Sequence, residues 1–186
     1  MGSVCRHVHY LRSCHVVVLC VLLGPCHIAM AGDAVENSGS FFRTLIPAVA
    51  YGTTFYLHDT PGRSEFYKSF FTNYAATYAL KQVVSKTRPN GADDESFPSG
   101  HASVAFQGAA FIHLRYGISY GVPAYIAASY VGWTRIESDN HYLVDVVAGA
   151  ALGIASSYVF TKPYHGVVAT PLVEHGFYGI SISKQW

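Results

Sequence analysis

The sequence predicts an all-α protein, built as a compact bundle of about five helices. Apolar stretches recur between residues 41 and 160, and each has the length of a helix rather than of a strand. Prolines and glycines, which end helices, stand between these stretches. The predicted helices are residues 41–57, 66–87, 101–116, 122–133 and 142–160.

Turn-forming residues bound the predicted helices in chain order. Pro61-Gly62 separates the first helix from the second, which ends before Pro89-Asn90-Gly91. The third helix ends at the glycine-containing segment 117–121, and the polar residues 137–140 follow the fourth. The fifth helix stops before Pro163, because proline cannot continue a helix.

After that proline the pattern changes from helical to strand-like. Residues 177–183 alternate between apolar and polar side chains, and residues 167–170 form a second short apolar run. Residues 171–176 can turn between the two. The sequence therefore predicts a small β-hairpin that caps the bundle.

Residues 1–31 have the three-part layout of a secretory signal peptide. Arg6 and Arg12 give a basic start, residues 16–23 are apolar, and Ala31 ends a small-x-small cleavage site. All four cysteines lie in this segment, so cleavage would remove every disulfide or thiolate metal ligand. We expect residues 32–186 to form a single domain. The alternative is an uncleaved membrane anchor, although the apolar run is short for a span.

Composition leaves two settings open for the helices. Basic residues number 12 and acidic residues 11, which gives no sign of nucleic-acid binding. Residues 41–57 contain Arg43 and residues 143–160 contain Asp145, so neither offers about 18 residues free of charge. The small side chains of the last helix permit close packing in a bilayer or in a soluble core. We expect a soluble or membrane-surface domain, with a membrane-spanning bundle as the alternative.

Two short segments supply groups suited to an anion. Lys81 and Arg88-Pro89, separated by six residues, provide two cations that only donate hydrogen bonds. Pro98-Ser99-Gly100-His101 reads as a turn that opens a helix, whose free backbone N–H groups attract negative charge. This turn also delivers a histidine.

A third segment adds Arg135, His141 and Asp145. The guanidinium fork of an arginine matches phosphate oxygens. At helical spacing His141 and Asp145 lie on one face, so we expect the carboxylate to bind one ring nitrogen and leave the other free to attack phosphorus. His101 then remains as the general acid, a role that suits a side chain titrating near neutral pH.

Each segment alone has an ordinary structural explanation, as a helix end, a turn or a surface pair. Together, in this order, they resemble the signature of the type-2 phosphatidic acid phosphatase superfamily, which includes vanadium haloperoxidases and bacterial acid phosphatases. The match covers residues 81–145, with Thr134 where the family usually has serine. With three cations to carry the charge, we expect no metal or cofactor. The resemblance implies a phosphohistidine on His141 and His101 as acid. It also implies phosphate binding by Lys81, Arg88, Ser99, Gly100 and Arg135.

The expected function is a metal-independent phosphatase that is exported to the periplasm, as a soluble or membrane-associated protein. Its substrate would be a phosphomonoester or pyrophosphate, most simply of a membrane lipid. The alternatives are a soluble acid phosphatase for small phosphomonoesters, a vanadium haloperoxidase, and a non-catalytic envelope protein that only binds phosphate. An intact His141, His101 and Asp145 argue against the last, because binding alone needs neither a nucleophile nor an acid.

Overall fold

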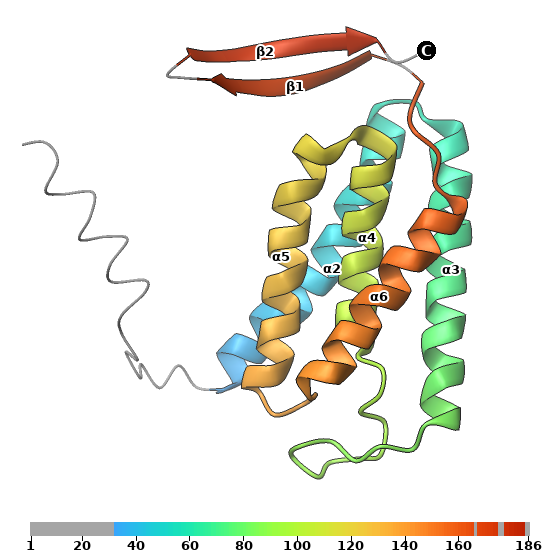
Figure 1. The fold of residues 1–186 in the computed structure, drawn as a ribbon, viewed down its shortest axis with the longest axis vertical. Helices are drawn as coiled ribbons and strands as arrows, with labels where there is room; N and C mark the ends of the chain where they lie inside the picture. The colour runs from blue at the N-terminus through green and yellow to red at the C-terminus, as the bar shows by residue number, and fades with distance from the viewer. Residues whose placement is uncertain (1–31, 166, 175–176, 185–186) are drawn as a thin grey trace, which may run out of the picture. The chain divides into compact units, whose positions relative to one another are not determined.

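The computed structural model describes residues 32–165, 167–174 and 177–184, and the predicted signal peptide lies outside them. In this part of the chain, five helices lie side by side and alternate in direction (Figure 1). The predicted all-α bundle is therefore confirmed. The helices are α2 (Gly32–Tyr56), α3 (Thr60–Val83), α4 (Gly100–Tyr116), α5 (Ile118–Glu137) and α6 (Leu143–Phe160).

Local capping moves several boundaries away from the predicted ones. α3 begins before residue 66 because the Asp59 side chain accepts a hydrogen bond from Gly62 N at 3.0 Å, and Pro61 suits a first turn. The same helix ends at Val83 rather than at residue 87, so the loop that carries Arg88 begins four residues earlier than predicted. α6 begins at Leu143, which leaves His141 outside it.

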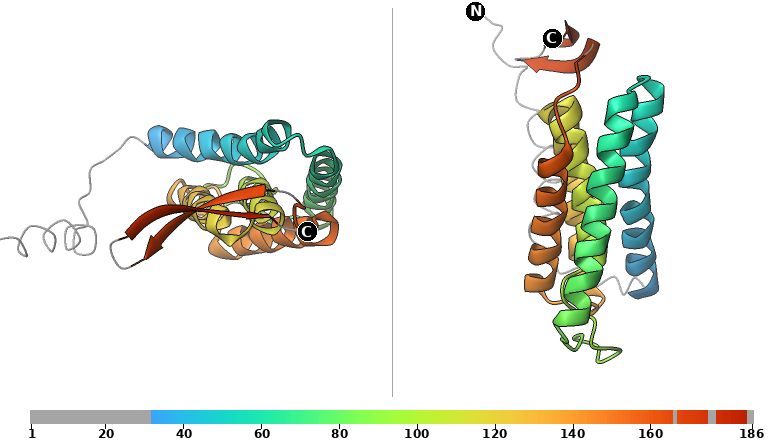
Figure 2. Two further views of the ribbon diagram at one scale, coloured as in Figure 1. Left: turned by 90° about the horizontal axis from the view of Figure 1, so that it is seen from above. Right: turned by 90° about the vertical axis from the view of Figure 1, so that its right-hand side faces the viewer.

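α4 is the central helix, and it contacts each of the other four (Figure 2). Most of its side chains are buried, including the polar Ser103 and Gln107. Ser103 Oγ lies 2.9 Å from Asn73 Oδ1, and Gln107 Nε2 donates to Ser69 Oγ at 2.9 Å. Hydrogen bonds therefore join α4 to α3 inside the bundle, where unpaired polar groups would be costly.

Glycines let α6 approach the backbone of α4 closely. A Cβ atom on Gly149 would fall well inside contact distance of the Ser99 carbonyl oxygen, and one on Gly153 would clash with that of Ser103. Neither neighbour can move easily, because both are backbone atoms. The approach fixes the first turn of α4 against the first turns of α6.

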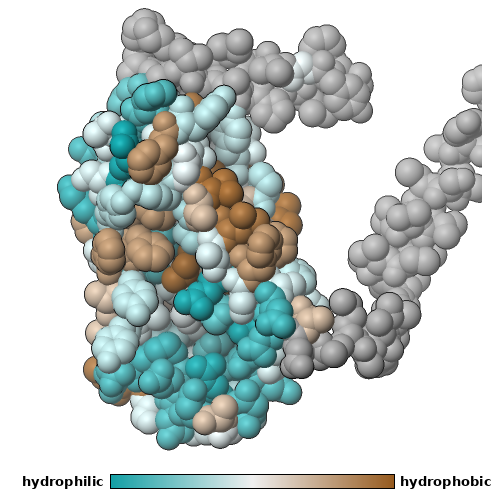
Figure 3. Space-filling view, turned by 180° about the vertical axis from the view of Figure 1, so that it is seen from behind, coloured by the Kyte–Doolittle hydropathy of each residue, from teal (hydrophilic) through white to brown (hydrophobic). Residues whose placement is uncertain are grey.

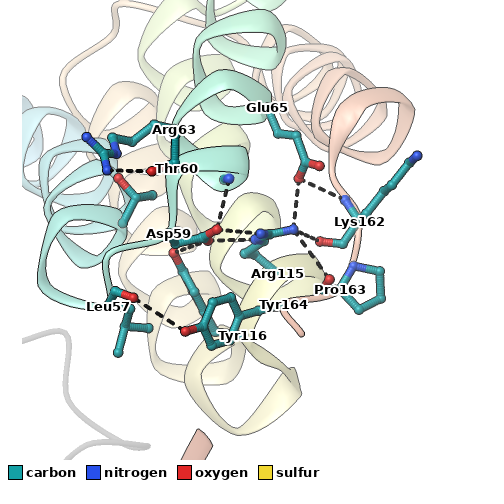
Figure 4. Close-up of polar contacts among 12 residues, drawn as sticks. Leu57, Asp59, Thr60, Arg63, Glu65, Arg115, Tyr116, Lys162, Pro163 and Tyr164 are labelled. Carbon is teal, nitrogen blue, oxygen red and sulfur yellow. Dashed lines mark hydrogen bonds and ion pairs between the residues drawn. The ribbon is translucent and has the colours of Figure 1, made fainter. Parts of the chain in front are cut away.

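A buried ion-pair cluster closes the opposite end of α4 (Figure 4). Arg115 Nε donates to Asp59 Oδ2 at 2.7 Å, and Arg115 Nη1 reaches Glu65 Oε2 at 3.1 Å. The same guanidinium donates to the carbonyl oxygens of Lys162 and Pro163, just after α6. The cluster thus ties α4, the start of α3 and the end of α6 together.

The middle of the bundle carries no aspartate, glutamate, lysine or arginine. Exposed apolar side chains cover this waist, among them Val49, Phe71, Ile126 and Val147. One face shows apolar side chains across its middle and a polar region at the end where residues 84–99 lie (Figure 3). The charge-free runs are residues 44–57, 69–80, 102–112, 116–134 and 146–161.

The two strands of the predicted hairpin are present and longer than expected, and their role as a cap on the bundle stays a prediction. β1 (Val167–Glu174) pairs antiparallel with β2 (Phe177–Lys184). Pro171, predicted to start the turn, lies inside β1 opposite Ile180. A two-stranded sheet accepts proline because each strand has an edge where no N–H group is needed.

We expect Gly149→Ala to destabilise the protein and Gly52→Ala to stabilise it. Both glycines are helical, and alanine favours a helix by up to about 1 kcal/mol. A Cβ on Gly52 has no neighbour within 4 Å, whereas one on Gly149 meets the Ser99 carbonyl. Overpacking of that kind costs about 1–3 kcal/mol. Denaturant unfolding of both variants measures the difference, and equal stabilisation by both would contradict the close packing.

Candidate active site

The alternating helix directions bring all three sequence motifs to one end of the bundle (Figure 1). Lys81 comes from the last turn of α3, and Arg88 from the loop that follows. Arg135 lies in the last turn of α5, and the loop after that helix carries His141. Residues 99–101 open α4 at the same end.

His141 is held by a backbone carbonyl group. Its Nδ1 atom lies 2.7 Å from the carbonyl oxygen of Ser96, and only 3% of the residue is exposed. A carbonyl oxygen only accepts, so Nδ1 must carry the proton and donate it. The Nε2 atom of the neutral ring then keeps its lone pair. This tautomer is the one that a nucleophilic histidine needs.

Asp145 does not bind His141 directly, which corrects the sequence-based expectation. Its carboxylate accepts from Lys86 Nζ at 2.5 Å, from Ser96 Oγ at 2.6 Å and from the backbone N of Tyr142 at 3.0 Å. The reason is that α6 starts only at Leu143, so the helical i,i+4 geometry does not apply to His141. Asp145 instead caps the first turn of α6.

Ser96 links the two residues, and sequence reasoning missed it. Its hydroxyl binds Asp145 while its carbonyl oxygen binds His141. Lys86 was missed as well, although it lies inside the Lys81–Arg88 motif. Its ammonium group pairs with Asp145 and lies 4.4 Å from the ring centre of Tyr142. Only their position in the sequence could have indicated a role, because each of the two residues stands two positions before a motif residue.

The three predicted phosphate-binding cations each have a protein partner. Arg88 Nε donates to Asp93 Oδ1 at 2.6 Å, and Lys81 Nζ donates to the carbonyl oxygen of Glu95. Arg135 Nη1 lies 3.3 Å from Glu36 Oε1 on α2. The buried Nε of Arg135 has no hydrogen-bond partner among the described residues. One donor of that guanidinium is therefore available to an anion.

The turn into α4 offers backbone donors, but fewer than predicted. Ser99 N donates to the carbonyl oxygen of Asp145 at 2.9 Å, and Ala102 N donates to the Ser99 side chain at 3.5 Å. Within the described part of the chain, the N–H groups of Gly100 and His101 have no protein acceptor. These two amides, at the positive end of the helix dipole, suit a bound anion.

His101 lies among positive charges. Its Nε2 atom is 3.4 Å from Arg43 Nη1 and 3.3 Å from the Ser40 hydroxyl. Burial, followed by the charges of Arg43 and Arg135, lowers the pKa of His101 to about 3. In the protein without an anion, His101 is therefore neutral at pH 7 rather than titrating near neutrality. An anion that offsets the cations would raise its pKa.

No group of three or more histidine, cysteine, aspartate or glutamate residues that could hold a metal ion occurs among the residues the structure describes. The charges that converge here are cationic, apart from Asp145 and the acidic partners of the arginines. The arrangement can bind an anion and present a histidine lone pair to it.

We expect NMR of histidine-labelled protein to show His141 as the Nδ1–H tautomer, neutral above about pH 5. Burial, followed by nearby Arg88 and Lys81, lowers the pKa of His141 to about 4, so protonation is disfavoured until the pH falls that far. Arg88→Gln removes one of these charges and should raise the pKa, whereas the distant Lys68→Gln should not. A titration midpoint near ~6.5 in the unaltered protein would contradict the site geometry.

Two curated proteins resemble the chain. One is a lipid A 1-phosphatase of Porphyromonas gingivalis, 42% identical over 79 residues, which make up 41% of this chain and 18% of that protein. The chain thus spans less than a fifth of that relative. The other is a lipid A 4'-phosphatase of Helicobacter pylori, 24% identical over 170 residues, or 82% of this chain and 85% of the relative.

Two crystal structures share the fold. Aquifex aeolicus LpxE matches with a TM-score of 0.52 and 19% identity, over 69% of this chain and 90% of that one. The transmembrane PAP2-type phosphatidylglycerolphosphate phosphatase of Bacillus subtilis matches with a TM-score of 0.56 and 23% identity, over 83% and 86%. The sequence pattern of the PAP2 superfamily matches residues 25–167, a range that includes every motif residue described above. The chain belongs to the PAP2 superfamily.

Proposed function

We propose that this protein is a phosphatase that hydrolyses a phosphomonoester or pyrophosphate of a membrane lipid through a phosphohistidine at His141. The observation that carries the proposal is the hydrogen bond from His141 Nδ1 to the Ser96 carbonyl, which leaves Nε2 as a free nucleophile. The charges of Arg88 and Lys81 act on that nucleophile, and the start of α4 lies at the same end of the bundle. This combination supports displacement at phosphorus.

The reaction would run in two steps. His141 Nε2 attacks phosphorus, the bond to the leaving oxygen breaks, and His101 donates its proton to that oxygen. Water then attacks the phosphohistidine, His101 takes a proton from the water, and phosphate leaves with His141 restored. Asp145 acts indirectly. It binds the Ser96 hydroxyl and so positions the Ser96 carbonyl group, which orients His141.

Positive side chains would carry the charge that builds up on the phosphoryl oxygens. Lys81, Arg88 and Arg135 serve this purpose together with the amides of Gly100 and His101. Asp93 and Glu36 hold two of the arginines in place, and a phosphate dianion can compete with them for the guanidinium groups. Because fixed cations neutralise the charge, the reaction needs no divalent metal ion.

The exposed apolar waist supports a membrane lipid as substrate. One described helix, Leu143–Phe160, is long and apolar enough to cross a membrane, and only 33% of it is buried. The core helix of a soluble protein would be mostly buried. α5 adds a charge-free run of 17 residues, 118–134, which spans about 26 Å in a helix against about 30 Å of bilayer hydrocarbon.

These features favour the membrane-spanning alternative over the soluble domain that composition favoured. In that setting the site lies at one end of the waist, at the level of lipid headgroups, with the tails of a substrate beside the helices. The names of the two curated relatives make lipid A the first substrate to assay. Phosphatidic acid and p-nitrophenyl phosphate then test for other lipids and for small phosphomonoesters.

We expect His141→Asn to abolish both turnover and the acid-labile phosphoenzyme. His101→Asn should slow the reaction by ~10²–10⁴-fold, because proton donation to the leaving group contributes about that much. His58→Asn at the far end of the bundle is the matched control, since His58 has a φ of 52°, which asparagine tolerates. Rapid-quench phosphate trapping and steady-state rates measure these effects, with and without EDTA. A phosphoenzyme that persists in His141→Asn, or a requirement for Mg²⁺ after EDTA, would reject this mechanism.

We expect the protein to stay in the membrane after washing with sodium carbonate and to be released only by detergent. The apolar waist has no other described element to cover it, so extraction into water would expose the side chains around α5 and α6. Fractionation followed by immunoblotting measures this, and N-terminal sequencing of the same sample tests cleavage after Ala31. Release by carbonate would contradict the membrane-spanning bundle and would favour a soluble or membrane-surface domain.

A further inference from the structure

Arg43 is a cation of the site end that lies outside the three motifs. It comes from α2, and its Nη1 atom lies 3.4 Å from His101 Nε2. Arg88 and Arg135 pair with carboxylates, but no carboxylate of the described residues forms an ion pair with Arg43. Its charge is therefore available to a bound anion.

The contact with His101 has a chemical consequence. A guanidinium group donates hydrogen bonds and cannot accept them, so His101 Nε2 must act as the acceptor. A proton on that nitrogen would place two donors and two positive charges against each other. His101 can deliver a proton from Nε2 only when Arg43 moves to another partner.

A pocket of about 220 Å³ provides a place for that partner. Arg43 and Lys81 line it together with Gly100, so the pocket borders the proposed phosphate site. Its volume is below that of sites for whole drug-sized ligands, and it fits part of a headgroup. The remaining lining residues are Tyr74, Thr77, Tyr78, Glu95, Ser103 and Val104.

We propose that Arg43 binds a second anionic group of the substrate, next to the leaving oxygen, and thereby selects substrates whose leaving group is negatively charged. The inference rests on the proposed function and goes beyond it by specifying the leaving group. When the anion takes Arg43, His101 Nε2 is free to hold a proton. The N–H bond then breaks as the O–H bond of the leaving group forms and the P–O bond gives its electron pair to that oxygen.

Two matched pairs of lipids test this in detergent micelles. Phosphatidic acid has a neutral leaving group and phosphatidylglycerol phosphate an anionic one, while farnesyl monophosphate and farnesyl diphosphate differ in the same way. Arg43→Gln should lower kcat/KM for the anionic member of a pair about 10- to 100-fold more than for the neutral member, as expected for the loss of a charged hydrogen bond. Arg43→Lys should recover part of the difference, because it restores the charge without the fork.

The two pairs also identify the position of the second anion. If the loss of kcat/KM differs within the farnesyl pair, the second anionic group is the phosphate joined through the phosphoanhydride. If it differs within the glycerolipid pair, the second anionic group lies elsewhere on the leaving alcohol. Lys68→Gln, an exposed residue of α3, is the control and should leave both ratios unchanged. Two outcomes would overturn the inference. If Arg43→Gln lowers kcat/KM equally for both members of each pair, Arg43 contacts only the transferred phosphate. If it lowers kcat/KM for none of the lipids, Arg43 does not contact the substrate.

Calorimetry separates this inference from the proposed function. The detergent-solubilised full chain is titrated with orthophosphate and with pyrophosphate. Arg43→Gln should weaken the binding of pyrophosphate about 10-fold more than that of orthophosphate. If the wild type hydrolyses neither lipid A nor any of the four lipids but shows this difference, the proposed function fails and the second anion site stands. If it hydrolyses them but both binding and rates lack the difference, the inference fails alone.

Discussion

The close approach of α6 to α4 is the contact on which the candidate site depends. Gly149 and Gly153 allow the two backbones to meet, and no side chain larger than hydrogen fits at either position. Because of this approach, Ser99 N donates to the carbonyl oxygen of Asp145 at 2.9 Å. The start of α4 and the start of α6 are thereby fixed together, and His101 and His141 with them.

A second layer of contacts sets the state of the nucleophile. The Ser96 carbonyl fixes the proton of His141 on Nδ1, and the Asp145 carboxylate holds Ser96 from the other side. Lys86 balances the charge of that carboxylate, which is fully buried. A buried carboxylate without such a partner would be costly, so the lysine stabilises the arrangement as well as completing it. The geometry is therefore a chain of contacts rather than a direct histidine–aspartate pair.

The two ends of the bundle use charge differently. At the far end, the Arg115 guanidinium donates hydrogen bonds to Asp59, to Glu65 and to two backbone carbonyl groups. These contacts hold three segments of the chain together. At the site end, Arg43 and the Nε of Arg135 lack such partners within the described residues. Cations without partners are unfavourable in a free protein. Because Arg43 and Arg135 both act on His101, these groups are what a site for a negatively charged ligand requires at that end.

The sequence by itself determined the class of fold, because apolar periodicity is a local property of the chain. It also identified the motif segments, which the structure places at one end of the bundle. It did not determine how Asp145 acts, because the partners of that carboxylate are set by contacts in the folded protein rather than by its spacing from His141. Ser96, Lys86 and Arg43 were also beyond it, because their roles come from contacts between segments up to 59 residues apart. The sequence also left open whether the helices cross a membrane. Only the packing shows that apolar side chains of α5 and α6 face outward, and this exposure favours a membrane-spanning bundle.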